Sequence, residues 1–112
     1  MTDPELEHLA SLDESSLLMQ IALADNAELA LYGPEDLIAY GRATVERLLP
    51  LARALICPHR AALDAPEVEV IMTVAAYLLA GLAGAIVKPL ATYLVKRGIE
   101  PLCANWHLHA SG

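Results

Sequence analysis

Residues Val68–Pro89 read VEVIMTVAAYLLAGLAGAIVKP and form a long apolar stretch in this chain of 112 residues. From Val70 to Val87 no side chain carries a charge. Such a run meets the lower length limit for a membrane-spanning helix, and it also suits the central helix of a small helical domain. The expected fold depends on which of these two environments surrounds the stretch.

The flanking residues predict one long apolar helix over about residues 67–97. Pro66 precedes its start, and Gly98 follows Lys96 and Arg97 at its end, where cations and then glycine are favoured. A straight helix of this range would be about 46 Å long, whereas a compact chain of this size has a radius of gyration of about 13 Å. We therefore expect the helix to kink near Pro89.

Composition favours an all-α fold. Ala and Leu dominate the apolar residues, while Phe is absent and Trp occurs once, a pattern that suits closely packed helices better than sheets. We predict a single helical domain over 1–112, a small bundle of about four helices around the apolar one. Residues 1–12 are expected to form a mobile acidic arm, 14–31 and 34–57 amphipathic helices, and 99–112 a short C-terminal tail.

Charge is unevenly distributed along the chain. The formal net charge is −7, and nine acidic residues precede the first basic residue, Arg42. Nucleic acid is therefore not an expected partner, because a phosphate backbone requires a concentrated basic face. Proteins are the expected partners, either further copies of this chain or a larger partner chain.

Small and polar residues recur along one side of the predicted long helix, at spacings of three and four. This pattern would let another helix approach closely, in water or in lipid, although a neighbour within the same chain would use it equally well. The candidate interaction residues are Thr73, Ala76, Tyr77, Ala80, Gly81, Gly84 and Lys88.

Two functions remain open from this pattern. The first is a non-enzymatic protein–protein interaction module or adaptor, which self-associates or packs its apolar helix on a partner. The alternative is a membrane-active or single-span protein, such as a small bacterial effector, that inserts residues 70–87. Basic residues lie on both sides of the stretch in similar number, so they give no clear membrane topology.

Cysteine and histidine residues suggest a third, lesser alternative, which is a metal-binding protein. Cys57, His59, Cys103 and His107 are candidate zinc ligands, but the first pair is too close together for the common zinc motifs. The basic, apolar start of a secretory signal is not present at the N-terminus. We therefore expect free thiols, a cytoplasmic location (alternatively the inner membrane), no cofactor and no enzymatic activity.

Overall fold

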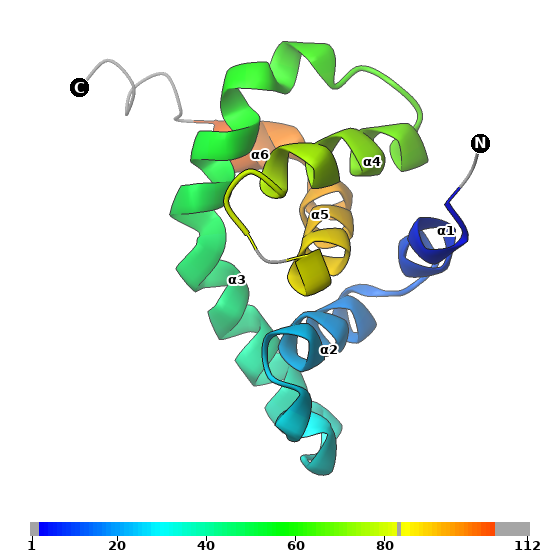
Figure 1. The fold of residues 1–112 in the computed structure, drawn as a ribbon, viewed down its shortest axis with the longest axis vertical. Coiled ribbons are helices and arrows are strands. Elements are labelled where there is room, and N and C mark those ends of the chain that lie inside the picture. Colours follow the sequence, from blue (N-terminus) through cyan, green and yellow to red (C-terminus); the bar gives the residue numbers. More distant parts are fainter. Residues whose placement is uncertain (1–2, 83, 105–112) are drawn as a thin grey trace.

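The computed structural model describes residues 3–82 and 84–104, and within them all regular secondary structure is helical. The described residues form six α-helices, whose arrangement is shown in Figure 1. The prediction of an all-α fold is confirmed. The elements are α1 (Pro4–Ala10), α2 (Glu14–Asp25), the 3-10 helix η1 (Ala27–Leu31), α3 (Pro34–Ile56), the 3-10 helix η2 (Cys57–Ala62), α4 (Glu67–Leu78), α5 (Gly84–Arg97) and α6 (Ile99–Cys103).

The prediction of one long apolar helix over 67–97 is wrong, because the apolar stretch forms two helices. After α4 two backbone hydrogen bonds span three residues instead of four: the Ala80 N–H donates to Tyr77 O, and the Gly81 N–H donates to Leu78 O. Glycine inside a helix is destabilising by about 1 kcal/mol, and Pro89 supplies no N–H to the residue four before it. α4 ends at Leu78 and α5 begins at Gly84, so the break comes before Pro89, which lies inside α5.

Reversal of the chain at this break lets the two apolar helices pack on each other. The longest extent of the described chain is 43 Å, slightly shorter than the length of about 46 Å that one straight helix over this range would have. Within the described residues, no helix combines the length and apolarity needed to cross a membrane.

Helix α5 occupies the centre of the fold. It packs with α1, α2, α4 and α6, and these helices surround it in Figure 1. Its side chains are buried over more than two turns, including Leu90 and Ala91 at 0% exposure. Apolar character on several sides thus reflects a helix with protein neighbours on several sides.

Helices α2 and α3 form the other close pair, and the chain between them differs from expectation. The predicted helix over 14–31 ends at Asp25, because the Asn26 side chain accepts from the Glu28 N–H and starts η1. Leu31, predicted on the apolar face, is instead 94% exposed. Gly33 and Pro34 then begin α3, as the sequence predicted for the next helix.

The segment predicted as an acidic arm carries α1, which joins the core. The Asp3 carboxylate accepts from the N–H groups of Glu5 and Leu6 and caps the helix. Leu6 and Leu9 are 2% and 5% exposed. Lys88 of α5 lies 3.0 Å from an Asp3 carboxylate oxygen and 3.2 Å from one of Glu5, so acidic residues of α1 face a cation of α5.

Close approach of α2 and α3 yields a first prediction, for Gly41→Ala. A Cβ at Gly41 would overlap the Leu18 carbonyl oxygen and lie 2.7 Å from its carbonyl carbon, so the two backbones must separate. We expect a loss of about 1–3 kcal/mol in the free energy of unfolding, from overpacking. Urea unfolding followed by circular dichroism measures this loss.

The matched control is Gly84→Ala, at the first residue of α5. A Cβ there meets no atom within 4 Å, so the free energy of unfolding should stay the same or rise slightly with the better helix propensity of Ala. Equal effects of the two substitutions would contradict the close approach of α2 and α3.

The α1–α5 ion pair yields a second prediction, for Lys88→Met. The hydrogen bond from Lys88 holds the pKa of Asp3 below its ordinary value of 3.8. The stabilisation of the folded state by ionised Asp3 is therefore present above pH 3.8 and lost as the pH falls through the lower folded-state pKa. In Lys88→Met the pKa of Asp3 should rise toward 3.8 in an NMR titration, whereas Lys96→Met should leave it unchanged.

Candidate functional site

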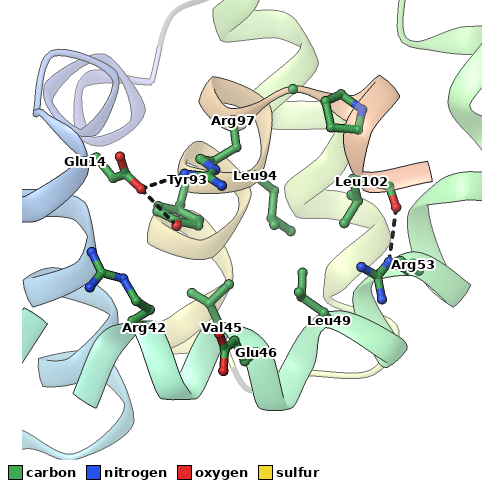
Figure 2. A pocket seen from close by; sticks show the side chains of 12 residues that line it. Glu14, Arg42, Val45, Glu46, Leu49, Arg53, Tyr93, Leu94, Arg97 and Leu102 are labelled. Atoms are coloured by element: carbon green, nitrogen blue, oxygen red, sulfur yellow. Dashed lines mark hydrogen bonds and ion pairs between the residues drawn. The ribbon is translucent and has the colours of Figure 1, made fainter. Parts of the chain in front are cut away.

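A pocket of about 520 Å³ separates α3 from α5 and α6. Figure 2 shows α3 along one side of it, with the end of α5 and the start of α6 opposite. Its size lies in the range of small-molecule sites in proteins. The lining residues are Glu14, Arg42, Val45, Glu46, Leu49, Arg53, Tyr93, Leu94, Arg97, Gly98, Pro101 and Leu102.

Helix α3 supplies one wall through the spacing of its residues. Arg42, Val45, Leu49 and Arg53 recur every three or four residues, which places them on one face of the helix. Val45 is buried and Leu49 half-buried between the two arginines. The wall is therefore apolar in its middle and cationic at both ends.

The junction of α5 and α6 supplies the opposite wall. Gly98 adopts a φ of 111°, in the region that favours glycine, and turns the chain from α5 directly into α6. Its N–H donates to Leu94 O at 3.0 Å, which ends α5 where the sequence predicted. This sharp turn brings Leu94 and Leu102 to the same pocket.

A polar cluster lies at the end of the pocket nearest α2. One oxygen of Glu14 accepts from Arg97 at 2.9 Å and from the Tyr93 hydroxyl at 3.2 Å. The Arg97 guanidinium also lies 5.9 Å from the centre of the Tyr93 ring. Burial of the side chain raises the pKa of Tyr93. The phenol therefore keeps its proton at ordinary pH and donates a hydrogen bond to Glu14.

Two arginines and a disulfide fasten α6. Arg53 Nε donates to Leu102 O at 3.1 Å, and Arg60 donates to Cys103 O at 3.0 Å. Cys57 of η2 and Cys103 of α6 form a disulfide across 46 residues of sequence. A five-residue helix thereby gains fixed attachments that its own hydrogen bonds cannot supply.

This disulfide corrects two expectations about the cysteines. The thiols are not free, and a disulfide sulfur is not the thiolate that zinc binds. His59 stacks on Tyr77 with ring centres 4.4 Å apart, and His107 lies outside the described residues. In residues 3–82 and 84–104, no three Asp, Glu, His or Cys side chains are grouped as a metal site. The expectation of free thiols came with that of a cytoplasmic location, which stays a prediction.

The predicted interaction residues are divided between α4, the break after it and α5. Ala76, Ala80, Gly81 and Gly84 are exposed, and Thr73, Tyr77 and Lys88 are half-buried. A Cβ at Gly81 would lie 3.1 Å from Leu55 of α3, so this glycine does allow a close helix approach, but within the chain. Lys88 pairs with α1.

The pocket itself was missed by sequence reasoning. Arg42 and Arg53 belong to the polar side of α3, which predicts only a solvated surface. A signal was present in their spacing with Val45 and Leu49, since all four residues share one face. What no helical pattern indicates is that α5 and α6 lie across from this face.

Fastening of α6 yields a third prediction. Replacing Cys57 and Cys103 with Ser removes a cross-link between distant residues, which should lower the free energy of unfolding by about 2–4 kcal/mol. α6 should lose protection from amide hydrogen exchange before α2 does, because Leu102 and Cys103 sit beside the lost cross-link. Equal protection of α6 in both proteins would show that the arginine contacts suffice.

In comparisons with known proteins, no family model, no curated protein and no solved structure matches the chain.

Proposed function

We propose that this protein is a non-enzymatic helical interaction module that self-associates through the outer face of α4. The observation that carries the proposal is the exposure of large apolar side chains there. Met72 is 41% exposed and Leu79, just after the helix, is 58% exposed. Ala76 lies between them and is also exposed.

The spacing of these three residues makes them one surface. Met72, Ala76 and Leu79 are separated by four and three residues, so they lie along one side of the helix. Leu51 of α3 is 38% exposed and extends the same surface, because it approaches Gly81 just after α4. We call Leu51, Met72, Ala76 and Leu79 the α4 face.

Fewer acidic residues flank this face, where Glu69 precedes Met72 by one turn, than flank the other exposed apolar site. Leu31 and Tyr32 are 94% and 58% exposed, but Glu28, Glu35 and Asp36 flank them in the sequence. From Val70 to Val87 there is no charged residue. Two copies of a chain with net charge −7 repel each other least through such a surface.

A twofold axis passing near Ala76 gives the arrangement that fits this face. In such a dimer the same patch contacts itself, so a small central residue permits close approach of the two helices. Met72 and Leu79 of each copy then flank the crossing point. Met suits this position because its flexible side chain adapts to a neighbour.

The fourth prediction tests this dimer by size-exclusion chromatography with multi-angle light scattering. The protein without detergent should elute as a dimer, and Ala76→Arg should convert it to a monomer, because two guanidinium groups would meet at the twofold axis. Ala76 is exposed, so the substitution should leave the helical circular dichroism spectrum unchanged.

Ala39→Arg is the matched control, since Ala39 is an exposed alanine of α3 outside the α4 face. It should remain dimeric. A monodisperse monomer of the unsubstituted protein, or a dimer that persists in Ala76→Arg, would refute self-association through this face.

A further inference from the structure

We propose that the pocket between α3, α5 and α6 binds an amphipathic carboxylate of fatty-acid type, with its head group on Arg53 and its chain along α3. This site is separate from the α4 face and does not depend on the protein forming a dimer. The proposal rests on an apolar surface inside the pocket and on cations at its ends that have no carboxylate partner in the described chain.

The apolar surface comes from both walls. Val45 and Leu49 of α3 face the pocket together with Leu94 of α5 and Leu102 of α6. Figure 2 shows Leu94 directed toward the space above Leu49. An apolar chain placed here would cover half-buried Leu49 and the small exposed remainder of Val45, Leu94 and Leu102, which contributes about 25 cal/mol for each Å² covered.

Arg53 is the cation best placed to hold the head group. Its side chain is half-buried, and among the described residues its one hydrogen bond is from Nε to Leu102 O. Among the described residues it forms no ion pair. The two terminal nitrogens therefore remain as a pair of donors, a geometry that matches the two oxygens of a carboxylate.

The other charged groups of the pocket are less suited to this role. Arg97 is already paired with Glu14 at 2.9 Å. Glu46 lies two turns of α3 before Arg53, about 10 Å away along the axis, and forms no ion pair with it in the described chain. Three arginines against two glutamates leave the pocket with an excess of positive charge.

The shape of the pocket favours an elongated ligand. Arg42 and Arg53 are eleven residues apart on α3, which corresponds to about 16 Å along the helix. Val45 and Leu49 lie between them. A straight apolar chain that starts at Arg53 would thus cover both residues and end near Tyr93 and Arg42.

The fifth prediction uses octanoate as the probe, with binding followed by the methyl NMR signals of Leu49 and Leu94 and by calorimetry. Octanoate should bind saturably and shift both signals. Octanamide, which has the same chain without the charge, should bind at least tenfold more weakly. Saturable shifts at the α4 face instead, or equal affinity for octanamide, would overturn the assignment.

Two substitutions on α3 separate the head-group contact from general charge. Arg53→Met should weaken octanoate binding at least tenfold, whereas Arg47→Met, which removes a charge outside the pocket, should leave it unchanged. If both substitutions weaken octanoate binding equally, the overall charge of the protein explains the effect, and the proposal is overturned.

A third variant tests the site without touching an arginine. Leu49→Trp should fill the space along α3 and abolish octanoate binding while the protein stays folded by circular dichroism. Undiminished binding to folded Leu49→Trp would place the ligand elsewhere. If octyl phosphate binds more tightly than octanoate, the site prefers a phosphate head group, and the assignment of a carboxylate is overturned.

Discussion

The reversal of the chain between Leu78 and Gly84 is the constraint on which the rest of this structure depends. The apolar residues on either side of it need protein neighbours all round, and one straight helix would present too much of that surface to too few partners. Folding the stretch back on itself makes α4 a neighbour of α5. Four elements then surround α5 and bury it over most of its length.

The central place of α5 explains features that are distant in the sequence. α1 is held because Leu6 and Leu9 find an apolar surface there and Lys88 faces two of its acids. α6 follows α5 without a linker, so its position is set by the Gly98 turn. The disulfide and two arginines then fix α6 to the end of α3 and to η2.

The two proposed sites arise from the same arrangement but differ in chemistry. The α4 face is left uncovered because α5 packs on another side of α4, and its apolar residues suit contact with another protein surface. The pocket exists because α3 packs on α2 and α4 while its middle stands away from α5. Its arginines and leucines suit a small molecule that has both a charged and an apolar part.

Local chemistry in the sequence was enough to predict the helical class and several helix ends. Gly33-Pro34 begins α3 and Gly98 ends α5 because the backbone preferences of glycine and proline act over a few residues. Periodicity likewise identified the apolar stretch as helical, but left open whether protein or lipid surrounds it. It did not predict the break within the stretch, because two glycines weaken a helix only slightly. The helical hydrogen bonds lost at the break are offset only when α4 and α5 pack on each other.

What only the tertiary structure decided is which distant residues meet. Cys57 and Cys103 are separated by 46 positions, and no local pattern distinguishes a cross-linked pair from two free thiols. From the sequence alone, the arginines of α3 are expected on a solvated surface. Their place in a pocket depends on α5 and α6, which lie opposite them. The reason is physical: helix type and helix ends are set by interactions within one or two turns, whereas burial, pairing and pockets depend on how separate helices pack.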